Sequence, residues 1–107
     1  MTTPIVVVNP YKVMMSGITV GTSPVNISAS GVGIFPEGLA CNAVIIENLG
    51  GSDVYIHHKS TDVAIEGFEV TNPSATNINS ITLPINRYTT LWAATAAGTA
   101  NIRMIFY

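Results

Sequence analysis

Residues 43–58, AVIIENLGGSDVYIHH, decide the fold, because they have the pattern of two strands joined by a tight turn. Val44 and Ile46 share one face of the first strand, while Val54 and Ile56 alternate with polar or aromatic neighbours in the second. The Gly-Gly-Ser sequence between the strands can adopt the positive φ angles that a tight hairpin needs. The stretch therefore predicts an antiparallel β-hairpin with its branched aliphatic side chains turned inward.

The same β pattern runs through the rest of the chain. Val, Ile and Thr recur, Gly, Pro or Asn interrupts them every few residues, and no segment has helical periodicity. Besides the hairpin, strand-like runs occur at residues 5–8, at 11–15 and 18–20 on either side of Gly17, at 25–29, at 63–65 and 68–70 on either side of Gly67, and at 81–85, 91–94 and 101–107. Roughly eight or nine short strands, with turn signals about every 8–12 residues, indicate an all-β fold, an antiparallel β-sandwich or barrel, with the jelly roll as one candidate form.

The chain of 107 residues has room for one hydrophobic core, so we expect a single β-domain spanning residues 1–107. Charged residues make up only 9% of it, against roughly 25% in an average soluble domain. The four basic residues are scattered along the chain, and we expect no nucleic-acid partner. A surface with so little charge could be covered by other protein, or could belong to a neutral β-domain without such a partner.

Two features concern where the protein is made. Cys41 is the only cysteine, which excludes an intrachain disulfide and fits folding in a reducing cytosol. The first residues lack the positive region of a secretory signal, and no apolar run approaches the roughly 20 residues that span a bilayer. We therefore expect a protein that is made without export and has no membrane partner.

Candidate residues for catalysis or metal binding are few. His57 and His58 are adjacent, and adjacent strand residues point to opposite faces, so the two rings could not share one metal ion. The alternative is one histidine on the surface and one at a sheet margin. The sequence around Cys41 contains no signature of an activated nucleophile. A lone cysteine among apolar residues is usually a small core residue. We expect no catalytic residue, no metal and no cofactor, and hence no enzyme.

Two further groups of side chains have both a functional and a structural interpretation. Glu66 and Glu69 could form a paired-carboxylate site if a bulge between them aligned their side chains. Otherwise they belong to a solvated acidic edge that discourages strand pairing. Trp92, with Tyr55 and Tyr88, could form an aromatic platform for a glycan, or could pack in the core or a subunit interface.

Three motifs of the second half occur in order: AVIIENLGGSDVYI at 43–56, ITLP at 81–84 and LWAATAAGTANIR at 91–103. They combine an apolar strand, Asn, a Gly-rich turn and Val-Tyr-Ile with a later Leu-Trp-Ala, Gly-Thr-Ala and Ile-Arg. This combination resembles a module of small structural proteins of tailed bacteriophages. The resemblance covers somewhat more than half of the chain and does not reach the first 40 residues.

The resemblance implies a virion component, made in the host cytoplasm, with a jelly-roll or related β-fold. Such components include capsid decoration (cement) proteins, which bind the outer capsid lattice and clamp neighbouring major capsid proteins together. Our leading hypothesis is a capsid decoration protein on the virion exterior, with the major capsid protein as its partner. The alternatives are a tail or fibre module that binds a host-surface glycan, and a small non-viral β-sandwich binding domain.

A continuous apolar run near the N-terminus is the first candidate for the contact with the capsid. It consists of Ile5, Val6, Val7 and Val8. Such a run pairs with a neighbouring protein, as part of an arm or exchanged strand of residues 1–9, or is an ordinary core strand.

A second contact candidate is the pair Ile34 and Phe35, which lies between two turn clusters. These two side chains either touch the capsid or plug one end of the sandwich. We also expect a homo-oligomer, a dimer or trimer, because few charges oppose self-association and unpaired strand edges need covering.

Overall fold

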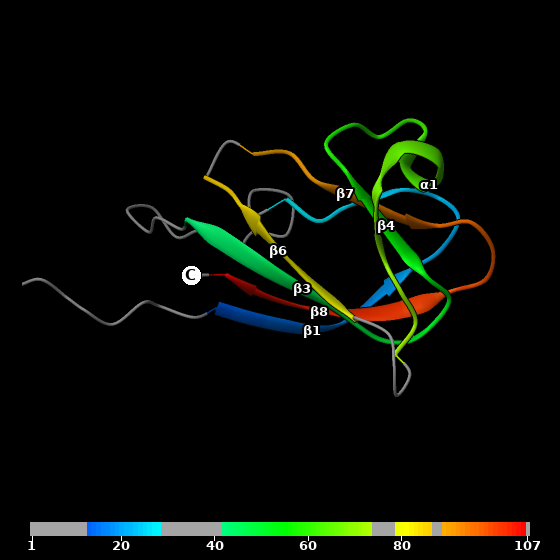
Figure 1. Cartoon of the computed structure of the whole chain (residues 1–107), viewed down its shortest axis with the longest axis horizontal. Helices are drawn as coiled ribbons and strands as arrows, with labels where there is room; N and C mark the ends of the chain where they lie inside the picture. Colours follow the sequence, from blue (N-terminus) through cyan, green and yellow to red (C-terminus); the bar gives the residue numbers. More distant parts are fainter. Residues whose placement is uncertain (1–12, 29–41, 74–78, 87–88, 107) are drawn as a thin grey trace, which may run out of the picture.

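A computed structural model of the chain describes residues 13–28, 42–73, 79–86 and 89–106. In these ranges the chain forms eight strands and one short helix (Figure 1). The strands and the helix follow one another in the order β1 Val13–Val20, β2 Val25–Asn26, β3 Ala43–Gly51, β4 Val54–His57, α1 Val63–Glu66, β5 Phe68–Val70, β6 Ser80–Pro84, β7 Trp92–Thr95 and β8 Ala100–Phe106. The predictions for residues 5–8, Ile34, Phe35, Cys41 and Tyr88 concern positions outside the described residues.

The strands form two four-stranded antiparallel sheets. Sheet A has the order β1-β8-β3-β6, and sheet B has the order β2-β7-β4-β5. The first strand thus pairs with the last, the second with the seventh, the third with the sixth and the fourth with the fifth. That nested pairing is the strand order of a jelly roll, and the predicted all-β sandwich is confirmed.

The core lies between the two sheets, where the inner faces meet. Val44 and Ile46 of β3 stand opposite Phe106 and Met104 of β8, and all four side chains are fully buried. Val54 and Ile56 face them from β4 and are equally buried. The inward positions predicted for residues 43–56 are therefore confirmed. The hairpin predicted there is wrong, because β3 belongs to sheet A and β4 to sheet B, so the turn between them crosses from one sheet to the other. Each such side chain contributes about 1.5–3 kcal/mol through its removal from water.

The two turns β3–β4 and β7–β8 meet at one end of the sandwich, which we call the closed end (residues 48–53 and 96–99). The Ser52 amide donates to the Thr99 carbonyl at 2.9 Å. Gly51 has φ +102°, and a Cβ there would run into the same carbonyl. Glycine is needed at this position for both reasons, because the backbones approach too closely for any side chain.

The Asn48 side chain lies inside the closed end and is fully buried. Its Nδ2 donates to the carbonyls of Ser52 at 2.9 Å and Val70 at 3.1 Å, and its Oδ1 accepts from the Gly50 amide at 3.0 Å. One amide side chain thus pairs three backbone groups and links β3 to β5 across the sandwich. A buried polar group of this kind is stable because its hydrogen bonds replace those lost from water.

The prediction of a strand at residues 63–65 is wrong, because this segment is the single helical turn α1. The Asp62 carbonyl accepts from the amides of Ile65 and Glu66, and the Gly67 amide donates to the Val63 carbonyl. The turn buries Val63 and leaves Ile65 82% exposed. A turn this short has too few residues to display a helical period, so the sequence pattern contained no signal for it. The strand predicted at 25–29 is also shorter, since β2 contains two residues.

The four outer strands of the sheets differ in how they discourage pairing with other chains. β1 has a register shift between Met15 and Ile18 with Gly17 at φ +78°, and β6 ends in Pro84, which has no amide proton. β2 and β5 contain only two and three residues. Bulges, proline and short length are the usual protections of a sheet edge. Within the described ranges, no helix is long and apolar enough to cross a membrane.

Candidate interaction groove

A groove of about 460 Å³ opens between the two sheets where β4 ends. Most of its wall is apolar and comes from both sheets. Its lining residues are Ile56, His57, His58, Glu66, Phe68, Leu83, Pro84 and Leu91. The volume falls within the roughly 300–1,000 Å³ of pockets that hold small ligands or side chains.

The groove exists because the sandwich is incompletely covered along this side. Phe68 stands opposite the fully buried Ile56, so it belongs to the inner face of sheet B, yet it is 62% exposed. Leu83 stands opposite the buried Val44 on the inner face of sheet A and is only partly buried. The strands that carry them, β5 and β6, are both at sheet edges. Inner-facing apolar side chains at two facing edges therefore remain open to solvent.

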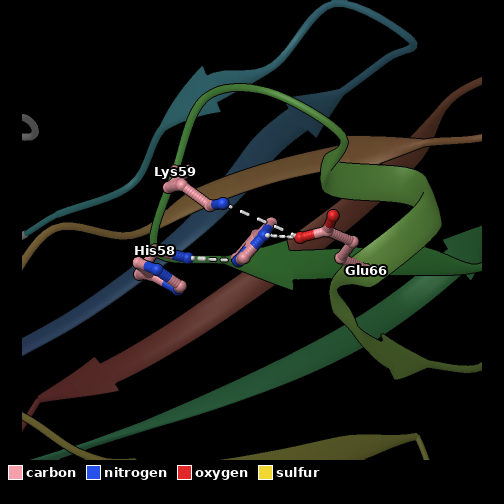
Figure 2. A network of polar contacts seen from close by, with 4 residues as sticks. His58, Lys59 and Glu66 are labelled. Atoms are coloured by element: carbon pink, nitrogen blue, oxygen red, sulfur yellow. Dashed lines mark hydrogen bonds and ion pairs between the residues drawn. The ribbon is translucent and has the colours of Figure 1, made fainter.

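His57 lines the groove and is only 8% exposed. Its Nδ1 accepts from the His58 amide at 2.9 Å, and its Nε2 lies 3.1 Å from Oε2 of Glu66. Because Nδ1 is an acceptor, the proton of the neutral ring is on Nε2, which donates to the carboxylate. Figure 2 shows these contacts together with the Lys59 ammonium, which lies 3.8 Å from the same carboxylate oxygen.

This network has no free group for acid–base chemistry at His57. A general base needs a ring nitrogen that can reach a substrate proton, and both nitrogens of His57 already have protein partners. The contacts instead fix the loop between β4 and α1 against the sheet. The Glu66 carboxylate is shared between His57 and Lys59, so the charges at the groove compensate one another.

One exposed apolar side chain, Phe68, extends the apolar wall of the groove to the surface. Ile65 of α1 and Phe68 of β5 are 82% and 62% exposed, and they are among three large exposed hydrophobic residues in the described parts of the chain. The third, Leu49, belongs to the closed end and is 43% exposed. Apolar side chains gathered beside a groove are typical of contact surfaces, whereas single ones are ordinary.

The aromatic residues proposed as a glycan platform come from neighbouring strands. Tyr55 stands opposite Ala94, and Trp92 stands opposite His57, so both belong to the outer face of sheet B. Tyr55 lines a second, more polar depression of about 340 Å³ at the closed end, together with Gly51, Ser52, Asp53, Asn72, Ala96 and Ala97. Trp92 is half-buried and lines neither hollow.

The two carboxylates flanking Gly67 have different partners. Glu66 contacts His57 and Lys59, whereas Glu69 stands opposite Tyr55 and accepts a hydrogen bond from it. That hydrogen bond, followed by burial and by the charges of Glu69 and Asp53, raises the pKa of the Tyr55 hydroxyl above its usual 10.0. Within residues 13–28, 42–73, 79–86 and 89–106, no three His, Cys, Asp or Glu side chains gather closely enough to hold a metal ion.

Sequence reasoning missed the groove and its wall of Phe68, Leu83, Pro84 and Leu91. Ile81 and Leu83 share one face of β6, but alternation alone gives no sign that the partner sheet stops short. The usable signal was the turn-forming loop 58–62 before Val63, which shortens sheet B beside β6.

Comparison with known proteins gives no relative: no family model matches the chain, and no curated protein is significantly similar to it.

Proposed function

We propose that this chain is a structural protein of a tailed-phage virion, of the capsid decoration type, that binds the outer lattice of the major capsid protein. The observation that carries the proposal is the open apolar groove with the exposed Phe68 in its wall, on a chain of which only 9% of residues are charged. Such a surface gains free energy when another protein covers it.

Two further observations support this proposal. The bacteriophage-like motifs of the second half coincide with β3 and β4 and with β6 to β8, which form most of both sheets. The jelly roll is also an architecture of viral capsid and lectin domains, which is an analogy at the level of the fold.

The proposed mechanism is thermodynamic. A protein that binds only the assembled lattice stabilises that lattice by mass action, and many copies add many small contributions. The apolar contact needs no large charge on either partner. We expect the protein to be made in the host cytoplasm and to act on the exterior of the virion.

The test is co-sedimentation of the purified chain with intact capsids of the phage that encodes it, beside free major capsid protein. We expect retention on expanded capsids, and a higher capsid melting temperature when the chain is bound. Absence of binding to both expanded and unexpanded capsids would contradict the proposal. A position of the gene beside a major capsid gene would be independent support.

The N-terminal run Ile5, Val6, Val7 and Val8 remains a prediction, which deletion of residues 1–9 tests. If the run is an arm that clamps the capsid, the shortened protein unfolds cooperatively and no longer sediments with capsids. If the run is a core strand, cooperative unfolding itself is lost. Sedimentation of the intact chain checks the predicted dimer or trimer.

A second candidate function is binding of a host-surface glycan, and one observation favours it. Tyr55 lines the polar depression at the closed end beside Asp53 and Asn72, and aromatic, carboxylate and amide groups suit a hydroxyl-rich ligand. A glycan array with the intact chain tests this candidate, with Tyr55→Ala and Trp92→Ala as variants. Loss of signal with Tyr55→Ala alone would place the glycan in this depression.

A further inference from the structure

We infer that the groove receives an extended, uncharged, apolar segment of a partner protein, which adds as a strand to the free edge of β6 and places one large side chain between Phe68 and Leu83. This inference rests on the proposed function only in taking the partner to be a protein. It specifies the chemistry of the contact, which the proposed function leaves open.

The walls of the groove define an apolar ligand. Ile56 and Leu91 are buried core residues, while Phe68 and Leu83 face inward but remain accessible from the groove. An apolar side chain placed between them would complete the contact between the inner faces of the two sheets. The gain would be about 25 cal/mol for each Å² of apolar surface removed from water.

The charged groups around the groove are already paired with one another, so they favour an uncharged ligand over an ionic one. The titratable groups that line or face it are His57, His58, Glu66 and Lys59. Glu66 is already bound by His57 at 3.1 Å and by Lys59 at 3.8 Å, and His57 is satisfied at both nitrogens. A charged ligand would have to break these contacts or remain unpaired, whereas an uncharged segment leaves them intact.

The free edge of β6 supplies the hydrogen bonds that an extended segment needs. β6 pairs with β3 from Ser80 to Pro84, and it is the outermost strand of sheet A in the described part of the chain. Strand addition to such an edge gives affinity through the main chain and specificity through alternate side chains. Pro84 has no amide proton, so the added ladder would end there and involve about four residues of β6.

The size of the surface argues for a segment rather than for a second globular copy. A standard interface buries about 800 Å² on each partner. An aromatic side chain such as Phe68 offers at most about 250 Å². The groove of about 460 Å³ can hold one or two large side chains. A short strand with a single apolar anchor matches these dimensions.

The experiment uses the full chain and one synthetic peptide, acetyl-Thr-Val-Thr-Phe-Thr-Val-Thr-amide, measured by calorimetry and by amide shifts in NMR spectra. We expect saturable binding, with the largest shifts in β6 and β5. Replacing the peptide Phe by Glu should weaken binding at least about tenfold, because the anchor is lost. N-methylating alternate peptide amides should weaken it similarly if main-chain pairing contributes.

Matched variants of the protein locate the contact. Phe68→Glu should weaken peptide binding at least about tenfold. Ile65→Glu makes the same change of charge at a more exposed residue that does not line the groove, and it should leave the affinity unchanged. Both side chains are largely exposed, so both variants should fold, and their thermal unfolding checks this.

Several results would overturn the inference. One is the absence of binding at 1 mM peptide, about the weakest affinity worth assigning. The others are an equal loss of peptide affinity in both protein variants and full affinity of the N-methylated peptide. Tighter binding by a peptide of residues 1–10 would also overturn it, by assigning the groove to a second copy of this chain. Capsid sedimentation in excess peptide separates the two proposals. If the chain still binds capsids in excess peptide, the groove is not the capsid contact, while the decoration function stands. If the chain binds the peptide but does not bind capsids, the groove inference stands and the decoration function is contradicted.

Discussion

The two ends of β5 lie two residues apart in sequence and differ sharply in their exposure to solvent. Val70 lies at the closed end and is 2% exposed, and its carbonyl accepts a hydrogen bond from the buried side-chain amide of Asn48. Phe68 also faces inward but lies at the groove and is 62% exposed. One end is sealed by hydrogen bonds and close backbone contacts, and the other is left open. Stability is therefore expected to depend on the closed end, and binding on the groove.

The largest effect is expected from Asn48→Ala, which removes the hydrogen-bond partner of one buried and two partly buried backbone groups. Unsatisfied buried groups cost about 1–3 kcal/mol each before relaxation, and we expect a total loss of about 2–4 kcal/mol. Urea unfolding followed by circular dichroism measures it. Asn101→Ala is the control, because Asn101 is exposed and should change stability by less than about 0.5 kcal/mol. Equal effects of both variants would contradict the role of the closed end.

Gly51→Ala should come next, with a loss of about 1–3 kcal/mol, because the new Cβ meets the Thr99 carbonyl at a positive φ. Gly21→Ala is matched in chemistry, but its Cβ would meet only a Thr99 methyl group at 4.0 Å. We expect Gly21→Ala to change the melting temperature by no more than about 2–4 °C. A tolerated Gly51→Ala would show that the two turns can separate without cost.

Tyr55 adds a pH dependence to the closed end. Its raised pKa means that the folded state favours the protonated hydroxyl, so the hydrogen bond to Glu69 contributes fully below pH 10.0. The contribution is lost as the pH rises through the raised pKa. The expected size is about 0.5 kcal/mol for a partly exposed hydrogen bond. Tyr55→Phe should therefore be less stable than the natural chain at pH 8 and equally stable at strongly alkaline pH.

Glu66→Gln tests the network at the groove. The variant keeps an oxygen that can accept from His57 but removes the charge facing Lys59. We expect a loss below about 0.5 kcal/mol that disappears in 1 M salt, because the ion pair is half-exposed. A salt-independent loss of larger size would mean that the carboxylate has a structural role in holding α1.

The smallest change in stability is expected for Phe68→Ala, within about 0.5 kcal/mol, since most of this side chain is already in water. Val70→Ala, two residues along the same strand, should cost about 1–3 kcal/mol because it empties a packed position. Thermal unfolding of the pair measures the comparison directly. A destabilisation by Phe68→Ala as large as that of Val70→Ala would mean that the groove is part of the core.

Much of the fold was predictable from the sequence, because alternation fixes which side chains can share a face. The inward positions Val44, Ile46, Val54 and Ile56 follow from period two, whereas the crossing of the β3–β4 turn from sheet A to sheet B does not. Glu47 and Arg103 form an ion pair on the outer face, with 2.7 Å between Oε2 of Glu47 and Nη2 of Arg103. This contact depends on which strands pair. Alternation within one strand contains no information about that pairing.

The candidate site was much harder to predict. The groove depends on where two facing sheets stop, and this results from β5 having three residues and from a helical turn of four residues before it. Alternation places Asn48 on the same face as Val44 and Ile46, but it does not identify which groups would satisfy a buried amide there. Its burial requires three backbone partners from different segments, and only the assembled structure brings them together.

The pairing of the first and last strands determines how the molecule would respond to a mechanical pull. Val13 at the start of β1 stands directly opposite Phe106 at the end of β8. Force applied at these two residues would break the hydrogen bonds between β1 and β8 one pair after another. It would not load all of them at once in shear. A protein attached to a surface through strands other than these would keep its sheets intact under tension, whereas tethering by both ends of the chain would peel sheet A open first.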